Sequence, residues 1–318
     1  RAASPCFGHE CWWCLHCRKQ CFSKSIFKFS ACSGQLQYVA GHTALTLPQM
    51  AADDQGKPAY WDDLAQEYDT EILSSFHENV NNTIKAALDA VHDGTPPKSA
   101  ANCIDFGCGV GKYLPALAER FTRVVGLDFS GGLVARAKLR LASTTNVEVF
   151  QADLTQRRRI NEALSESVVG FEPIAFAVCT NVLLAPSTKA RMSILRNLFA
   201  TVAEDGTVLL VVPSRESALF VNHVLRRWQG DDVARREGLS GRKDDVLVGL
   251  LNRGETLTKH YLREEIILDC EDVGFEVKSS AKVEYKWSTE FEFATKKVPK
   301  KVKGCALPWD WLLVLRRT

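Results

Sequence analysis

The chain has 318 residues, of which 46% are hydrophobic and 25% are charged, an ordinary balance for a folded globular protein. Its formal net charge is only +2, so the composition gives no sign of the basic surface that tight nucleic-acid binding requires. No apolar run approaches the roughly 20 residues that a membrane helix needs, so we expect no membrane partner.

Residues 1–49 differ in composition from the rest of the chain. They contain five Lys or Arg residues, one acidic residue and six of the eleven cysteines. Met50 then opens a segment that would suit the start of an enzyme. We interpret 1–49 as a disordered leader or mis-called upstream segment, and 50–318 as the domain. An organelle transit segment is the alternative, because serine is frequent and acids are scarce in 1–49.

The cysteines support two different interpretations. Cys11, Cys14, Cys17 and Cys21 follow the spacing of a bacterial iron–sulfur run, but the proline after the last cysteine and a second set are missing. Short motifs of this kind often match by chance, so we expect no metal site. The scattered cysteines beyond residue 50 are typical of small core residues in a reducing compartment, which favours a cytoplasmic protein.

From about Ala59 the chain alternates between helical and strand-like segments. A helical pattern covers 60–91 and ends at a linker that contains glycine and proline. Short apolar strands in β-α-β alternation predict a mostly parallel sheet with both faces covered. The expected strands are 102–106, 123–127, 147–151, 174–179 and 207–212, and the expected helices between them are 112–120, 132–142 and 188–203.

The later part of the chain is less regular. Residues 214–260 are polar with charges of both signs, and we interpret them as a helical insertion that caps the acceptor side. Residues 261–280 follow the pattern of a helix, a turn at Gly274 and a strand, and 308–317 would form a closing strand.

The first predicted strand leads into the sequence CIDFGCGVGKYL, which begins at residue 103. Its glycines, Gly107, Gly109 and Gly111, allow a ligand to approach the backbone, but Lys112 occupies the position where a dinucleotide loop requires glycine. Asp105 would repel a pyrophosphate and attract an ammonium group. S-adenosylmethionine carries an ammonium and a sulfonium and no phosphate, so it suits this loop better than a nucleotide does.

Further polar residues follow the next strands. Asp128 ends the second strand, 17 residues after Gly111, close to the interval of about 20 expected for an acid that binds a ribose. Asp153 follows the third strand, where it would accept a hydrogen bond from an adenine amino group. The fourth strand ends at Cys179, and we expect Cys179 and Asn181 to contact the cofactor as well. Each acid alone is as readily a solvated loop residue. Three in succession at strand ends indicate a binding crevice.

These segments resemble successive motifs of class I S-adenosylmethionine-dependent methyltransferases. The resemblance covers roughly 59–318 and is carried by CIDFGCGVGKYL, VVGLDFSGGLVARAK, FQADL and the run from FAVCTNVLL to VVPS. It implies an α/β, Rossmann-like, doubly wound sheet of seven strands. The sheet would be mostly parallel with an antiparallel last strand, and helices would cover both faces.

The resemblance also implies roles for individual residues. Asp105 and the loop Gly107–Gly111, including Cys108, would contact the methionine portion of the cofactor. Asp128 would bind the ribose, with Phe129 and Ser130 beside it, and Ser130 would also cap the following helix. Asp153 and Leu154 would contact the adenine. Tyr60 and Tyr68 lie in a segment similar to the helix that covers the cofactor in many small members, although amphipathic packing explains them equally well.

The methyl acceptor is harder to predict, because methyl transfer requires orientation and a dry site and no obligatory base. His223, His260 and Tyr261 are candidate proton acceptors, and each is as readily structural. The fourth strand is followed by Thr180, Asn181, Val182 and Leu183. The motif Asn/Asp-Pro-Pro-aromatic, which branches that methylate exocyclic or amide nitrogens carry at this point, is absent. The paired-glutamate loop of protein-arginine methyltransferases is absent as well.

We therefore expect a small-molecule acceptor selected by 214–260 and by the loop 283–305. One alternative is an RNA or protein methyltransferase that uses the basic run 296–303. A second is a non-catalytic module that only binds S-adenosylmethionine. A third, a nucleotide-binding oxidoreductase, is disfavoured by Asp105 and Lys112.

Overall fold

The computed structural model describes residues 61, 62, 65, 75–91, 99–167, 169–170, 172–229, 243–253, 256–288 and 304–318. The chain divides into two units, Arg1–Gln49 and Met50–Thr318, and all described residues belong to the second. The predictions for 1–49, Tyr60, Tyr68 and 296–303 therefore lie outside the described residues.

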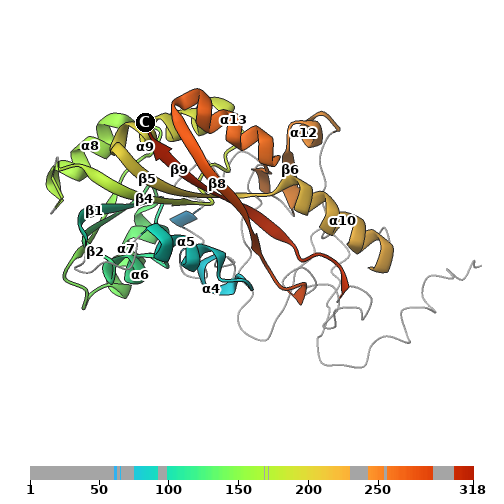
Figure 1. Ribbon diagram of the computed structural model, residues 1–318, viewed down its shortest axis with the longest axis horizontal. Helices are drawn as coiled ribbons and strands as arrows, with labels where there is room; N and C mark the ends of the chain where they lie inside the picture. The colour runs from blue at the N-terminus through green and yellow to red at the C-terminus, as the bar shows by residue number, and fades with distance from the viewer. Residues whose placement is uncertain are drawn as a thin grey trace, which may run out of the picture. The chain divides into compact units, whose positions relative to one another are not determined.

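A seven-stranded sheet forms the centre of the second unit (Figure 1). Its order is β3-β2-β1-β4-β5-β9-β8. The strands β3, β2, β1, β4 and β5 pair in parallel, whereas β9 is antiparallel to both of its neighbours. This confirms the predicted fold and the reversed last strand. The strands are β1 (Ser99–Phe106), β2 (Phe121–Asp128), β3 (Val147–Gln151), β4 (Ile174–Thr180), β5 (Val202–Pro213), β8 (Phe275–Glu284) and β9 (Trp309–Arg317).

Helices cover both faces of this sheet, as Figure 1 shows. One face packs against α8 (Arg157–Glu166), α9 (Thr188–Thr201) and α13 (Arg263–Val273). The other packs against α5 (Thr83–Val91), α6 (Leu114–Ala118) and α7 (Gly131–Arg140). The central strands are buried on both sides, which explains why their sequences are continuous apolar runs instead of alternating patterns.

The predicted helix over 60–91 is interrupted. It contains α4 (Ser75–Glu78) and α5, and between them Asn82 adopts a left-handed backbone conformation with φ of 51°. A left-handed residue cannot continue a right-handed helix, and asparagine tolerates it better than most residues do. Residues 61 and 62 are helical as well.

The prediction of a helical insertion over 214–260 is only partly right. The described residues contain α10 (Arg215–Gln229) and α12 (Lys243–Leu247), but also an antiparallel hairpin of β6 (Leu250–Arg253) and β7 (Thr256–Lys259). Each of these strands has only four residues, too few to establish a period in the sequence. The hairpin contacts the sheet end, because the Lys259 amide donates to the Leu184 carbonyl just after β4.

The order of the strands places the site. Chain connections run outward in one direction from β1 through β2 to β3 and in the other direction from β4 to β5. The carboxyl ends of β1 and β4 therefore flank the point where the strand order reverses, and this is where open parallel sheets bind ligands.

Candidate functional site

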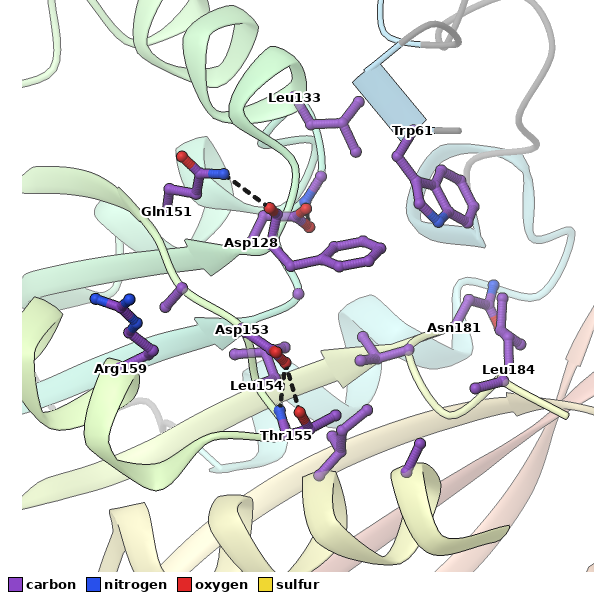
Figure 2. Close-up of a pocket in the computed structure, with 18 of the residues that line it drawn as sticks. Trp61, Asp128, Leu133, Gln151, Asp153, Leu154, Thr155, Arg159, Asn181 and Leu184 are labelled. Carbon is purple, nitrogen blue, oxygen red and sulfur yellow. Dashed lines mark hydrogen bonds between the residues drawn. The ribbon is translucent and has the colours of Figure 1, made fainter. Parts of the chain in front are cut away.

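A cavity of about 590 Å³ lies at the carboxyl ends of β1, β2, β3 and β4 (Figure 2). Its lining includes seven residues predicted from the sequence, namely Gly107, Gly109, Asp128, Phe129, Asp153, Leu154 and Asn181. The topology brings them together because all four strands are parallel and end at the same edge of the sheet.

The glycine loop follows β1 with left-handed backbone angles. The φ angles are 95° at Gly107, 54° at Gly109 and 78° at Gly111. A Cβ atom at position 107 would also overlap Val182 Cγ2, so only glycine fits there. The loop is fixed on its inner side, because the amides of Gly107 and Cys108 both donate to the Leu127 carbonyl at 2.8 and 2.9 Å.

Asp128 lies at the end of β2 and is tied to the glycine loop. One of its oxygens accepts from the Gly109 amide at 2.9 Å, and the other accepts from the Ser130 amide at 3.0 Å. Burial raises the pKa of Asp128 to about 6, although these backbone hydrogen bonds act in the opposite direction, and the charge of Asp62 raises it further. The carboxylate retains further lone pairs that can accept from hydroxyl groups in the cavity.

Asp105 is the most unusual residue near the loop. Its side chain is 1% exposed and lies behind the glycine loop, outside the cavity wall, and neither carboxylate oxygen has a hydrogen-bond partner among the described residues. Burial raises its pKa from 3.8 to about 8, and the negative charge of Asp128 raises it further. A buried carboxylate without a partner is costly unless a cation or donor joins it, so this position fits a cationic ligand.

Asp153 has a local structural role in addition to its place in the cavity wall. One oxygen accepts from the amide and hydroxyl of Thr155, at 2.9 and 2.7 Å, and the other accepts from Gln156 at 2.6 Å. These bonds fix the turn that leads into α8. Asp153 therefore reaches the cavity as an oriented acceptor.

Several predicted residues support the cavity without lining it. Ser130 is fully buried and caps α7 by accepting from the Leu133 amide at 3.1 Å, as predicted. Cys108 and Cys179 are buried, and burial raises the pKa of both thiols. Gly111 packs close to α6 and α7. Cys108, Cys179 and Gly111 therefore have packing roles in this structure, and their contact with a cofactor stays a prediction.

The three candidate proton acceptors do not line the cavity either. His223 is exposed on α10 and His260 is 8% exposed. Tyr261 is 1% exposed, and its hydroxyl donates to the Leu183 carbonyl at 2.9 Å. Burial raises the pKa of Tyr261 far above its ordinary value, so it has no readily available anionic form. The geometry gives Tyr261 a positioning role in the loop after β4.

Sequence reasoning missed other parts of the wall. Gln151, the last residue of β3, donates to the Phe129 carbonyl at 3.0 Å, and Thr180 is the last residue of β4. Both positions follow from the rule that strand ends line the crevice. Ala190 and Ile194 line the cavity from α9, one turn apart, and resemble ordinary core residues in the sequence.

Trp61 also lines the cavity, and it directly follows the predicted site residue Tyr60 in the sequence. Figure 2 shows it on the opposite side of the opening from Gln151 and Arg159. Its neighbour Asp62 accepts from the Ser130 hydroxyl at 2.5 Å and from the Gly132 amide at 2.8 Å, at the N-terminus of α7. These bonds tie Asp62, the residue after the cavity-lining Trp61, to the start of α7.

The comparison with known families agrees with this geometry. A family model described as a methyltransferase domain matches residues 76–280, more than half of the chain. The chain belongs to this family. It contains a class I methyltransferase domain of the kind that uses S-adenosylmethionine.

The methyltransferase is also similar to individual proteins. A structure of an S-adenosylmethionine-dependent methyltransferase from Anabaena variabilis aligns with 86% of this chain and 99% of its own, at 18% identity and a TM-score of 0.55, and so shares the fold. A sugar N,N-dimethyltransferase of Streptomyces venezuelae, which acts on a dTDP-linked amino sugar, is 27% identical over 150 residues. A 23S rRNA uracil C(5)-methyltransferase of Stenotrophomonas maltophilia is 37% identical over 78 residues.

Both curated relatives match the methyltransferase over only part of their lengths. The alignment covers 55% of the sugar methyltransferase and 17% of the rRNA enzyme, and 47% and 24% of this chain. Among the described residues, no helix has the length and hydrophobicity needed to cross a bilayer.

Proposed function

We propose that this methyltransferase transfers the methyl group of S-adenosylmethionine to a small-molecule acceptor, with the cofactor held in the cavity. Asp105 pairs with the ammonium of the methionine portion, Asp128 accepts from the ribose hydroxyls, and Asp153 with Leu154 contacts the adenine. The observation that carries the proposal is the buried carboxylate of Asp105, which has no hydrogen-bond partner among the described residues and lies beside the glycine loop.

The residues present fit this cofactor better than they fit a phosphate-bearing one. Two buried carboxylates, Asp105 and Asp128, are close enough for the charge of one to raise the pKa of the other. A pyrophosphate placed beside them would add repulsion in a poorly solvated site. When bound, S-adenosylmethionine supplies a methyl group on a positively charged sulfur. The protein supplies orientation, a counter-charge and exclusion of water.

The size of the cavity, which must hold the cofactor as well, supports a small acceptor. A volume of about 590 Å³ lies within the range of roughly 300–1,000 Å³ that is typical of small-molecule sites. The similarity to a sugar N,N-dimethyltransferase supports the same conclusion, because it extends over 150 residues of this chain.

An RNA acceptor has less support. The similarity to the rRNA enzyme is confined to 78 residues. The basic run 296–303, which would supply an RNA contact, lies outside the described residues. A low-salt retention assay on RNA distinguishes this alternative, because contacts to phosphates weaken steeply as salt rises.

Calorimetric titration with S-adenosylhomocysteine tests the proposal. We expect the wild type to bind one equivalent, and Asp128→Ala to bind at least about tenfold more weakly because two hydroxyl donors lose their acceptor. Asp205→Ala is the matched control, since Asp205 is an exposed carboxylate paired with Arg316 at the opposite end of β5. Undetectable binding to the wild type would refute the proposal. Salt-sensitive retention on RNA, followed by methyl transfer to RNA, would favour the alternative acceptor.

A further inference from the structure

Asn181 combines three unusual features at the end of β4. It lines the cavity, its φ angle is 55° in the left-handed region, and its side-chain oxygen Oδ1 is buried without a hydrogen-bond partner among the described residues. A left-handed residue other than glycine is uncommon and costs energy, and an unsatisfied buried oxygen costs more. Such costs are typical of functional positions.

The position of Asn181 in the sheet places it at the far end of the cavity from the adenine side. Asp153 follows β3, Asp128 ends β2, the glycine loop follows β1 and Asn181 follows β4, in the same order as the strands. Three strand spacings separate β3 from β4, about 14 Å in total. Figure 2 accordingly shows Asn181 and Leu184 on the side of the cavity away from Gln151 and Arg159.

The backbone around Asn181 is fixed before any ligand arrives. Its amide donates to the Val211 carbonyl at 2.9 Å, and the next residue, Val182, packs against Gly107. The carbonyls of the next residues are also hydrogen-bonded: Leu183 accepts from the Tyr261 hydroxyl, and Leu184 accepts from the Lys259 amide. A side chain on such a fixed loop is suited to orienting a reacting group.

We propose that Oδ1 of Asn181 accepts a hydrogen bond from the methyl acceptor, and that this acceptor is an uncharged amine. The inference rests on the proposed function and adds the acceptor class to it. Oδ1 can only accept, so the acceptor must carry a hydrogen at that point. An N–H bonded to Oδ1 fixes the direction of the nitrogen lone pair.

The choice of an amine over an alcohol follows from the groups that are present. The titratable residues among the described lining residues are Asp128, Asp153 and Arg159. The two carboxylates already accept hydrogen bonds, and Arg159 is paired with Glu162. An alcohol needs a base to remove its proton as it reacts, whereas an uncharged amine already has a nucleophilic lone pair.

The step balances without a protein base. A bond forms between the amine nitrogen and the methyl carbon, and the bond between that carbon and sulfur breaks with its electron pair left on sulfur. The product nitrogen is positively charged, and its proton passes to water after transfer.

Substitution to glycine gives a sharp test, because a φ of 55° suits glycine at least as well as asparagine. Asn181→Gly removes the amide and keeps the backbone. Asn82→Gly is the matched control, because Asn82 is an exposed asparagine at a φ of 51° that does not line the cavity. Asn181→Asp keeps an accepting oxygen and removes the N–H₂ group.

The assay uses a panel of amines, alcohols, thiols and carboxylic acids with a labelled methyl donor. We expect transfer to amines, with kcat/KM about tenfold lower in Asn181→Gly and unchanged in Asn82→Gly. The same amine should bind about tenfold more weakly to Asn181→Gly saturated with S-adenosylhomocysteine, and wild-type affinity should persist in Asn181→Asp. Affinity for S-adenosylhomocysteine should stay unchanged in all three variants, and neither glycine variant should melt below the wild type, because glycine adopts a left-handed backbone without strain.

Four results would overturn the inference. Two concern the acceptor: methyl transfer only to oxygen, sulfur or carbon, or no transfer to any amine by protein that binds S-adenosylhomocysteine. Two concern the variants: wild-type turnover of the amine by Asn181→Gly, or loss of amine binding by Asn181→Asp. Failure of the wild type to bind S-adenosylhomocysteine would instead refute the proposed function, and this inference with it.

Discussion

Asp105 and Asp128 lie at the carboxyl-terminal ends of neighbouring parallel strands, as the penultimate and last residues, and the charge of Asp128 adds to the effect of burial in raising the pKa of Asp105 to about 8. The free protein therefore holds a proton on Asp105 at neutral pH. A ligand with an ammonium group favours the ionised carboxylate, so its binding must displace that proton.

Binding of S-adenosylhomocysteine should accordingly release close to one proton at pH 7 and little above pH 9. With a pKa of about 8 in the free protein, Asp105 is protonated at pH 7 in most molecules. Affinity should rise with pH between about 6 and 8, since the proton competes with the ligand. Calorimetry at pH 7 in two buffers with different ionisation enthalpies measures the release. Asp105→Asn should bind weakly and release no proton from this site, and equal release in this variant would assign the proton elsewhere.

Asp105 should also make the stability of the free protein depend on pH. Its folded pKa lies above its unfolded value of 3.8, so the folded state binds the proton more tightly than the unfolded chain does. This contribution is complete below about pH 4 and is lost as pH rises to about 8, at up to about 1.4 kcal/mol per unit. Asp105→Asn lacks the effect. Urea denaturation at pH 5, 6, 7 and 8 should show the free energy of unfolding of the variant rising relative to that of the wild type as the pH increases. If the two proteins have the same dependence on pH, this prediction is wrong.

Gly107→Ala should destabilise the protein by about 2–4 kcal/mol. The substitution combines a strained left-handed conformation with overlap between the new Cβ and Val182 Cγ2. The double variant Gly107→Ala/Val182→Ala removes the overlap but not the backbone strain. Its loss in the free energy of unfolding should therefore be smaller than the sum of the losses in the two single variants, but it should not disappear. Urea denaturation of the four proteins gives the coupling energy. Strict additivity would show that the two side chains do not compete for space.

Tyr261→Phe should test whether Tyr261 positions the loop or acts as a base. Loss of the hydroxyl leaves the buried Leu183 carbonyl without this donor and should cost about 1–2 kcal/mol of stability. Because the hydroxyl is not in the cavity wall, the shape of the pH–rate profile should stay the same once an acceptor is known. If the variant instead loses one of the pH-dependent arms of the pH–rate profile, Tyr261 acts as a proton acceptor.

The fold was largely predictable because buried parallel strands have a simple signature. The run 174–179 is wholly apolar, 123–127 is apolar after Arg123, and 102–106 is apolar apart from Asn102 and Asp105. Each run lies within an observed strand. The start of β5 was not predictable in this way. The strand begins at Val202, five residues before the expected boundary, and includes the polar residues Glu204 and Asp205. Backbone pairing, and not side-chain hydrophobicity, sets that end.

Part of the cavity was also predictable, and part was not. Asp128 and Asp153 were identified because strand ends meet at one edge of a parallel sheet. Ala190 and Ile194 of α9 could not be identified, since a cavity wall and a hydrophobic core use the same residue types. The left-handed angle at Asn181 was not predicted either, and the neighbouring contact joins Val182 to Gly107, 75 positions away in the sequence.

The placement of β9 has a consequence for how the sheet is assembled during synthesis. The chain makes β8 before β9, yet β9 lies between β5 and β8 and hydrogen-bonds to both (Figure 1). A nascent chain that has released everything up to Glu284 from the ribosome therefore carries a strand with no place in the sheet. The five parallel strands that bear the cavity can pair earlier, whereas β8 must wait about 2–6 seconds for residues 285–317 at ordinary elongation rates.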